Sequence, residues 1–391
     1  MISSILPKRI LCLDMDAFFA SVEQAKDPSL KGKAVAVAGK SIIIAASYEA
    51  RKLGVKVGLN IYEARQRIPK IKIIPAQYRS YAEFSQRIAD YLYSISPDAV
   101  MYSIDEGFVD ITDNPLKSAE IGALIRNWLK KNLNATGSVG IGPTYVAAKM
   151  ATKVMKPDGY FEATEKNRLA FMDCFTLKDV WGIGRRTEKS LKARGIFSLA
   201  DIRLVGEQRL QQFYGRVRGT TLFRLACGLD AEHPLSERSG GQKSISRSTT
   251  ANREINDIPL ALAYLLHLSE EVAYAARKQL YAGESVSIFL RDNAWESYSY
   301  KCSLHFYTSA VHHIYEAAKT LFLENVKRGS FRVFGVCLAN LQGGAAVLAN
   351  LEDFMNGADE KYKKLYAAID KINADTPCGI KRCSTLKLIS A

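Results

Sequence analysis

The chain has 391 residues, a length typical of two to four domains. Hydrophobic residues make up 48% and charged residues 24%, which is the composition of a folded protein and excludes an intrinsically disordered one. The formal net charge of +14 favours a polyanionic partner, either nucleic acid or an anionic membrane surface. The sequence contains no apolar run long enough to cross a bilayer and no signal-peptide pattern, so we expect a cytoplasmic protein.

The cysteines and histidines give no sign of a zinc site. The chain has seven cysteines without a C-x-x-C pair and five histidines. Reduced thiols at apolar positions, in a reducing compartment, are the expected state. The role of Cys378 and Cys383 stays open.

In chain order, the first part alternates between strands and helices, as in a small sheet with helices on one face. A buried strand over residues 9–15 ends in an acidic pair, and residues 19–74 form a smaller inserted unit. Residues 100–111 predict a hairpin with acidic residues at its tip. A helix over 118–133, a strand over 137–142 and a helix over 144–155 follow.

The second part of the chain predicts two further units and a tail. Residues 164–232 indicate short helices joined by Gly-centred turns, and residues 233–242 are polar and rich in Gly and Ser, which is typical of a linker. Strands and helices over 243–350 predict an α+β domain. Within 351–391 a helix places five apolar residues on one face, which we expect to dock or to recruit a partner: Tyr362, Leu365, Tyr366, Ile369 and Ile372.

Acidic residues stand at the ends of two apolar strands. Asp14 and Asp16 end the first strand, and Asp105 with Glu106 interrupts the hairpin. Like charges held close together cannot all ionise at low cost, so a divalent cation is the natural partner of such a cluster. A solvated strand end is the alternative for any single acid. Asp14 is predicted to be a metal ligand and Asp16 structural, because we expect the two side chains to face opposite ways.

Basic residues suited to phosphate follow two of the strands. Arg51 offers a planar fork for a phosphate tail, with the Tyr48 hydroxyl beside it. Lys149 and Lys153 are predicted to share a helical face, and Lys156 to lie at the end of that helix. Solvated surface cations are the alternative reading, which the neighbouring acids make the weaker one.

The segment WGIGRRTEKSLKARGI over residues 181–196 predicts contact with a nucleic-acid backbone. A Gly-Ile-Gly turn opens a helix, so its free N–H groups can bind a phosphate while the following cations add charge. This is the helix-hairpin-helix pattern of sequence-independent DNA binding. The predicted DNA-binding residues here are Gly182, Gly184, Arg185, Arg186 and Lys189.

In this order, five segments within residues 9–233 resemble the Y-family DNA polymerases, the DinB- and UmuC-type translesion enzymes. The segments are LDMDAFFASVEQ, SYEARKLGVKVG, YSIDEGFVDIT, SVGIGPTYVAAKMATKVMKPDG and VWGIGRRTEKSLKARGI. The resemblance implies an α+β, multidomain right-hand polymerase. Its parts would be a ferredoxin-like palm (1–18 and 75–163), small fingers (19–74), a helical thumb with the helix-hairpin-helix (164–232), a linker (233–242), an α+β little finger (243–350) and a C-terminal helix and tail (351–391).

The resemblance also implies roles for individual residues. Asp14, Asp105 and Glu106 would bind two Mg²⁺ ions together with the carbonyl of Met15. Three residues would hold the triphosphate of a dNTP: Tyr48, Arg51 and Lys156. Phe18 and Phe19 would line the sugar, with Phe19 as a steric gate against a 2′-hydroxyl. Arg247, in the opening strand KSISRSTT of the little finger, would contact DNA.

The implied activity is low-fidelity translesion synthesis on primer-template DNA, with no membrane partner. Every segment is assigned, which leaves none for a proofreading exonuclease. Small residues such as Gly58 and Ala45 would leave room for a damaged template base. A sliding clamp and SOS accessory proteins are expected partners, although ANLEDF (349–354) lacks the glutamine of a clamp-binding pentapeptide.

Two other functions use many of the same residues. A two-metal phosphodiesterase or nuclease needs the carboxylates and the DNA-binding turn, but has no use for a triphosphate site or a sugar gate. A non-catalytic DNA-binding subunit would not require all three acids.

Overall fold

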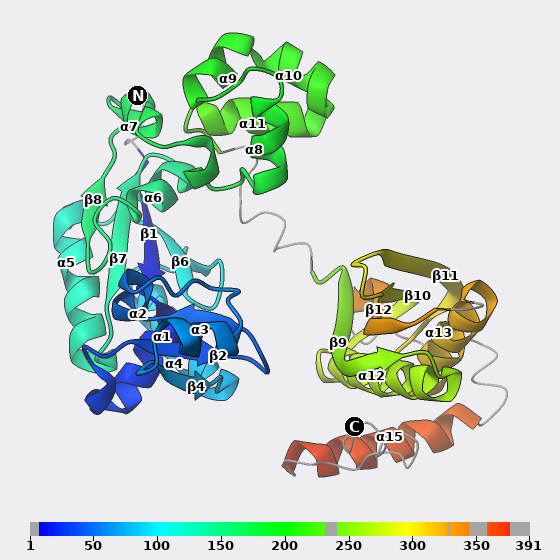
Figure 1. Ribbon diagram of the computed structural model, residues 1–391. Helices are drawn as coiled ribbons and strands as arrows, with labels where there is room; N and C mark the ends of the chain where they lie inside the picture. Colours follow the sequence, from blue (N-terminus) through cyan, green and yellow to red (C-terminus); the bar gives the residue numbers. More distant parts are fainter. Residues whose placement is uncertain (1–7, 231–240, 327–328, 344–357, 376–391) are drawn as a thin grey trace. The chain divides into compact units, whose positions relative to one another are not determined.

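The computed structural model describes residues 8–230, 241–326, 329–343 and 358–375 (Figure 1). The chain divides into two compact units, residues 1–237 and 238–391. The predicted linker lies largely outside the described residues, as do ANLEDF, Cys378 and Cys383. No helix in the described part of the chain is both long and apolar enough to cross a membrane.

The first unit is built on a five-stranded sheet. Its strand order is β5-β6-β1-β7-β8, with β1 antiparallel to both β6 and β7. The strands are β1 (Ile10–Met15), β5 (Val100–Met101), β6 (Glu106–Asp110), β7 (Gly137–Gly142) and β8 (Tyr160–Glu162). The turn of the predicted hairpin lies between Met101 and Glu106, slightly earlier than predicted, so Glu106 opens the second strand.

Helices cover both faces of this sheet, so the prediction of helices on one face was wrong. Side chains alternate along β1: Leu11 and Leu13 pack with α4 (Tyr78–Ile95) and α5 (Ser118–Trp128), whereas Cys12 faces α6 (Tyr145–Ala151). The strand β7 lets α6 approach closely because it carries glycines. A Cβ on Gly140 would lie 2.2 Å from the Ala148 carbonyl oxygen.

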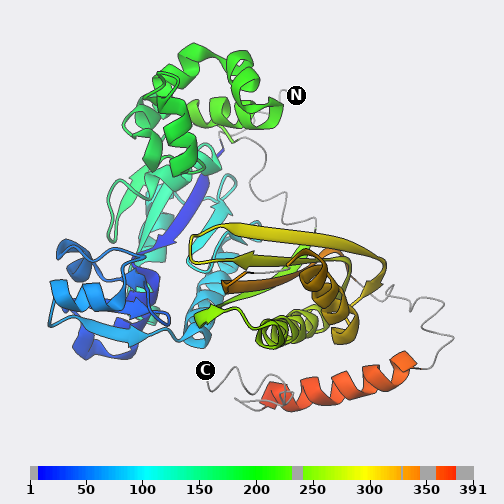
Figure 2. The same cartoon turned by 45° about the vertical axis from the view of Figure 1, so that its right-hand side comes forward.

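A smaller three-stranded sheet occupies the region predicted as the inserted unit. Its strand order is β3-β2-β4. Figure 2 shows this region in blue at the lower left of the view. The strands are β2 (Val35–Ala38), β3 (Ile43–Ala46) and β4 (Lys72–Pro75), and the helices are α1 (Phe18–Lys26), α2 (Tyr48–Lys52) and α3 (Ile61–Arg67). Its core is small and rich in alanine, with Ala36, Ala46, Ala50 and Ala64 all buried.

Five α-helices follow, as predicted for the thumb region. They are α7 (Arg168–Asp173), α8 (Arg185–Lys192), α9 (Leu199–Val205), α10 (Glu207–Tyr214) and α11 (Arg216–Ala226). Their core includes Val146 and Met150 of α6, so these helices are packed onto the same helix that covers the larger sheet.

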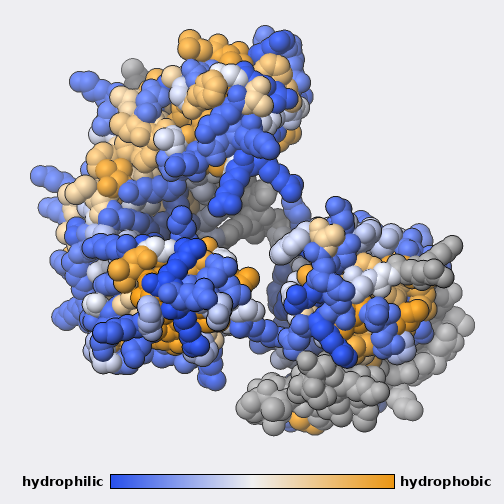
Figure 3. All heavy atoms as spheres, viewed as in Figure 1, coloured by the Kyte–Doolittle hydropathy of each residue, from blue (hydrophilic) through white to orange (hydrophobic). Residues whose placement is uncertain are grey.

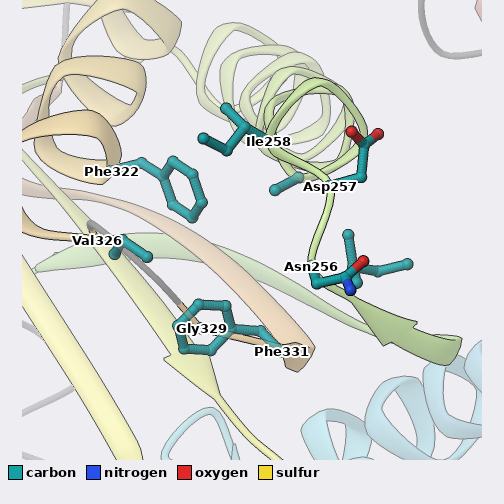
Figure 4. A pocket seen from close by; sticks show the side chains of 9 residues that line it. Asn256, Asp257, Ile258, Phe322, Val326, Gly329 and Phe331 are labelled. Atoms are coloured by element: carbon teal, nitrogen blue, oxygen red, sulfur yellow. The ribbon is translucent and has the colours of Figure 1, made fainter.

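The second unit has a four-stranded antiparallel sheet of order β11-β10-β12-β9 with helices packed on one face (Figure 2). The strands are β9 (Ser244–Ile255), β10 (Tyr281–Arg291), β11 (Ser297–Thr308) and β12 (Phe331–Gly343); the helices are α12 (Ile258–Lys278) and α13 (Val311–Asn325). This confirms the predicted α+β domain. A cavity of about 270 Å³, lined by Phe322 and Phe331 among others, opens beside the start of α12 (Figure 4).

The predicted C-terminal helix is present as α15 (Ala358–Asp375) and docks on the second unit. Tyr366 is buried, and Asp370 forms a two-pronged ion pair with Arg277 of α12. Leu365 and Ile372 are nearly half exposed, so only part of the predicted apolar face is covered. Elsewhere in the view of Figure 3, hydrophilic side chains predominate and apolar ones form small patches.

Candidate active site

Two of the predicted acids lie directly opposite each other on neighbouring strands. Asp14 of β1 pairs in register with Glu106 of β6, and the residues two positions away, Cys12 and Phe108, are paired in the same way. Opposed residues of an antiparallel pair point to the same side of the sheet, here the side that α6 covers. The strand register therefore brings Asp14 and Glu106 together.

Two lysines neutralise this pair. The ammonium of Lys149, on α6, lies 2.5 Å from Asp14 Oδ2 and also contacts Glu106 Oε1. The ammonium of Lys156 contacts Asp14 Oδ1 and lies 3.5 Å from the carbonyl oxygen of Met15. Burial works against the charged form of Asp14, but these two ammonium groups outweigh it and hold its pKa below the ordinary value. Asp14 is therefore ionised at neutral pH.

The third predicted acid is close in the backbone but differs in its side-chain contacts. The Asp105 carbonyl accepts a hydrogen bond of 3.0 Å from the Met15 N–H, while its carboxylate accepts one of 2.7 Å from Ser103 Oγ. Within the described residues, no three acidic, histidine or cysteine side chains lie close enough together to hold one ion. The structure thus brings Asp14 and Glu106 together and leaves the Asp105 carboxylate on its own turn.

The expectation that Asp14 and Asp16 face opposite ways was wrong. Residues two apart on a strand share a face, and β1 in any case ends at Met15. Lys156 contacts Asp14 and lies 3.9 Å from Asp16 Oδ1, so both carboxylates face the same lysine. Asp16 is almost fully buried and holds other parts of the protein in place, in keeping with the structural role predicted for it.

The role of Lys149 was missed. It was predicted to share a helical face with Lys153 as a source of positive charge for phosphate, but α6 ends at Ala151 and Lys149 is only 5% exposed. Lys153 instead contacts the Asp179 carbonyl of the thumb region. One signal was available in the sequence: Lys149 is the single charge in the otherwise apolar segment YVAAKMA.

Tyr48 and Arg51 lie next to this cluster. The Tyr48 hydroxyl donates to Asp16 Oδ1 over 3.4 Å, and the Arg51 guanidinium stands 5.1 Å above the Tyr48 ring. Burial and the charge of Asp16 raise the pKa of Tyr48 to about 12, so its hydroxyl remains a donor at neutral pH. Ser47 caps α2 by accepting from the Ala50 N–H, which fixes the helix that carries both residues.

The two predicted sugar-contacting phenylalanines differ in exposure. Phe18 is buried in the core of the larger sheet, whereas Phe19 is only partly buried. The Phe19 ring stacks on Tyr81 with a centroid distance of 4.2 Å. Tyr81 is itself fixed by donating a 2.8 Å hydrogen bond to Glu23.

The predicted DNA-binding turn has its apolar residue inside and its polar groups outside. Ile183 is buried in the thumb core, while the flanking glycines and the first turn of α8 are exposed. Gly184 is the N-cap of α8, so the first N–H groups of this helix face solvent. The exposed predicted residues are Gly182, Gly184, Arg185, Arg186 and Lys189.

Arg247 lies on the edge strand of the second unit. It pairs in register with Val336, which in turn pairs with Ile288, and both of those residues are buried under the helices. Arg247 therefore belongs to the helix-covered side, although its side chain is exposed. The opposite, uncovered side presents mainly small hydroxyl side chains: Ser246, Ser248, Thr250, Ser287 and Ser299, with Lys301.

Comparison with known proteins identifies the class. The family model of the impB/mucB/samB family matches residues 13–153, and that of its C-terminal domain matches residues 242–351. DNA polymerase IV of Desulfatibacillum aliphaticivorans is 32% identical over 371 residues, which is 93% of each chain. DNA polymerase IV 1 of Bacillus subtilis is 28% identical over 371 residues, 93% of this chain and 89% of that one.

A solved Y-family DNA polymerase, a chimera of Dbh and Dpo4, has the same fold with a TM-score of 0.76 and 25% sequence identity. The match covers 86% of this chain and all of that one. The fold and the relatives thus identify the chain as a DNA-directed DNA polymerase. The chain belongs to the Y family, and within it to the DinB type.

Proposed function

We propose that the protein performs low-fidelity translesion synthesis by two-metal nucleotidyl transfer from a dNTP to the 3′-hydroxyl of a DNA primer. One observation carries the proposal: Asp14 and Glu106 are opposed on adjacent strands, and the buried Asp14 carboxylate and the partly buried Glu106 carboxylate share the ammonium group of Lys149. Such a pair of acids binds cations, and the family to which the chain belongs uses divalent cations. A nuclease would require the same acids, but the relatives are polymerases.

The donor atoms fit Mg²⁺. Asp14, Asp105, Glu106 and the Met15 carbonyl offer only oxygen, which is the ligand that Mg²⁺ prefers. Two ions about 4 Å apart would activate the attacking hydroxyl and stabilise the leaving phosphate oxygen when bound. The lysine ammonium groups stand where positive charge is needed, which supports a cation site at these acids.

Tyr48, Arg51 and Lys156 are proposed to hold the triphosphate. Tyr48 and Arg51 supply a hydroxyl and a guanidinium from α2, and Lys156 supplies an ammonium beside the carboxylates. A guanidinium binds phosphate oxygens in pairs, and a lysine binds them as a point charge. Phe19 is proposed as the steric gate for the sugar. Phe18 is buried in the core, so its ring would support the Phe19 ring rather than lie flat against the sugar.

DNA would be held by two surfaces. The turn at Gly182 to Lys189 offers helix N–H groups and three cations for phosphates. The uncovered sheet face of the second unit offers hydroxyl groups, which hydrogen-bond to DNA in a largely sequence-independent manner. The contact from Arg247 stays a prediction, and its side chain would have to reach DNA from the edge of β9.

Lesion tolerance is proposed to rest on the small side chains of the fingers, whose core is rich in alanine. Gly58 is not a suitable position for testing this proposal by enlarging the side chain. Gly58 has a φ of +91°, so any larger residue there strains the backbone even though the space around it is open. Ala45, buried on β3, is the better position for enlargement.

The partners and location are proposed from the family alone. Primer-template DNA and a dNTP are the substrates. Contact with a sliding clamp, a link to the SOS response and a cytoplasmic location stay predictions.

Primer extension tests the proposed function directly. The protein with a labelled primer-template, the four dNTPs and Mg²⁺ should lengthen the primer, and it should continue past an abasic template site that stops a replicative polymerase. Shortening of the primer would indicate the nuclease instead. Extension that stops at every damaged template base would refute the translesion part alone.

A further inference from the structure

Asp16 is a buried acid that no predicted metal or substrate role explains. It is 1% exposed, directly after the end of β1. A buried carboxylate is tolerated only when hydrogen bonds or charges compensate it. The groups that bind the Asp16 carboxylate therefore indicate which parts of the protein its negative charge holds together.

The two carboxylate oxygens of Asp16 bind three separate parts of the first unit. Oδ1 accepts from the Ser138 hydroxyl of β7 over 2.9 Å and from the Tyr48 hydroxyl of α2 over 3.4 Å. Oδ2 accepts from the backbone N–H of Asp158 over 2.7 Å. The Lys156 ammonium lies 3.9 Å from Oδ1.

The Asp158 contact fixes the segment that presents Lys156. This segment is held at two further points. The Gly159 N–H donates to Ser138 Oγ over 3.3 Å, and the Asp158 carboxylate pairs with Arg126 over 3.1 Å and with Lys130 over 2.5 Å. Asp16, Arg126 and Lys130 thus all hold Asp158, which is two residues from Lys156.

The Tyr48 contact reaches the other side of the proposed triphosphate site. Tyr48 opens α2, and the guanidinium of Arg51 lies over its ring. Arg51 is further oriented by donating from Nε to the Ala46 carbonyl over 2.9 Å. One carboxylate is therefore bonded both to the tyrosine beside Arg51 and to the segment that carries Lys156.

We propose that Asp16 is a positioning residue that, before the dNTP binds, holds the Tyr48 side chain and the Lys156 segment at the spacing that a triphosphate requires. This proposal rests on the proposed function of Tyr48, Arg51 and Lys156. It differs from a metal role: Asp16 touches the residues that bind the substrate, and it acts through them. Positioned donors bind a charged group with little reorganisation, so their spacing sets affinity for the substrate.

The test is Asp16→Asn in primer extension with dATP as the variable substrate. The amide has the same shape, but it has one acceptor where the carboxylate has two, so Tyr48 or the Asp158 N–H loses its partner. We expect KM for dATP to rise at least about tenfold, with a smaller fall in kcat. Inhibition by inorganic tripolyphosphate, which lacks base and sugar, should weaken by the same factor.

Electrostatics alone predicts the opposite result. Removing a negative charge beside an anion-binding site should strengthen binding of dATP if Asp16 acts only through its charge. Tighter or unchanged binding of dATP and tripolyphosphate would therefore overturn the proposal. Asp110→Asn is the matched control, because Asp110 ends β6 of the same sheet and accepts from the Thr112 N–H over 3.0 Å. Its KM for dATP should stay within about twofold of the parent value.

A second variant keeps the test open if Asp16→Asn does not fold. Ser138→Ala removes a hydroxyl that contacts both Asp16 and the Gly159 N–H, without touching Tyr48 or Lys156. It should raise KM for dATP in the same direction by a smaller factor, and no rise would count against Asp16. An unsubstituted protein that fails to extend a primer would refute the proposed function itself, whereas normal extension by both variants would refute only the role of Asp16.

Discussion

The palm and the thumb both use basic side chains, but in opposite settings. Lys149 of the palm is buried and bonded to two acids, while Arg185, Arg186 and Lys189 of the thumb turn are exposed. A buried cation fixes the geometry of its partners because it cannot exchange them for water. Exposed cations supply attraction at little geometric cost. Under the proposed function, the comparison separates a part of the molecule that performs chemistry from a part that holds DNA.

Removal of a carboxylate should have the largest effect and should leave the thumb untouched. Asp14→Asn and Glu106→Gln are each expected to reduce primer extension by on the order of 10³-fold, since cation binding contributes several kcal/mol. DNA affinity should stay within about twofold. Single-turnover extension and fluorescence anisotropy on the same DNA measure the two quantities. If both variants still extended the primer, the proposed division between a catalytic palm and a DNA-binding thumb would be wrong.

Removal of the buried lysine should sharpen the comparison through stability. Lys149→Met leaves Asp14 and Glu106 without their shared ammonium, which is expected to cost about 3–5 kcal/mol in the presence of a chelator. Added Mg²⁺ should recover part of this loss, because a cation that binds the native state stabilises it. Lys153→Met, at an exposed lysine, is the control. Equal melting temperatures for the two variants would contradict the buried role of Lys149.

The thumb turn should show a smaller effect of a different kind. Arg185→Ala combined with Arg186→Ala is expected to weaken DNA binding about tenfold near 0.1 M salt and to reduce the salt slope by about two. Extension at saturating DNA should change less than about twofold. Titrations at several salt concentrations measure the slope. A large fall in extension at saturating DNA would mean that the turn also affects the chemistry.

The smallest expected effect concerns pH. Burial opposes the charged form of Asp158, but Arg126 and Lys130 outweigh it and hold the pKa of Asp158 below its ordinary value. The stabilisation is thus present above the unfolded pKa, near 4, and is lost as pH falls through the lower folded value. Asp158→Asn should cost about 1 kcal/mol at pH 7, because the pair is partly exposed.

Chemical unfolding at several pH values checks this. The difference between Asp158→Asn and the parent protein should begin to shrink as pH falls below the unfolded pKa, near 4, and should vanish only below the lower pKa of the folded protein. A difference that grows with acidity would mean that Asp158 is not charged in the folded protein.

The strand-end acids and the family could be predicted from the sequence because short motifs carry them. Asp14 and Glu106 each follow or open an apolar run, and strand pairing then brings them together. The contact of Lys149 with these two acids could not be predicted from a short motif. Its position depends on α6 packing on β7, which the spacing of residues within the helix does not reveal.

The remaining differences have similar causes. The predicted opposition of Asp14 and Asp16 misapplied the two-residue period of a strand. The side of the sheet on which Arg247 lies depends on which face the helices cover, and only the assembled domain shows this. The exposure of Leu365 and Ile372 likewise depends on how α15 is docked by Tyr366 and Asp370.

The close approach of α6 to β7 has a consequence for large-scale mutagenesis. A methyl group on Gly140 or Gly142 would meet the backbone of Ala148 at 2.2 Å and 2.6 Å. In a screen that scores survival or mutation rate, these glycines would rank as high as the acids, for an unrelated reason. Measuring the amount of soluble protein would distinguish the two classes of variant. The glycine variants would be lost from the soluble fraction of the lysate, and the carboxylate variants would accumulate as folded, inactive enzyme.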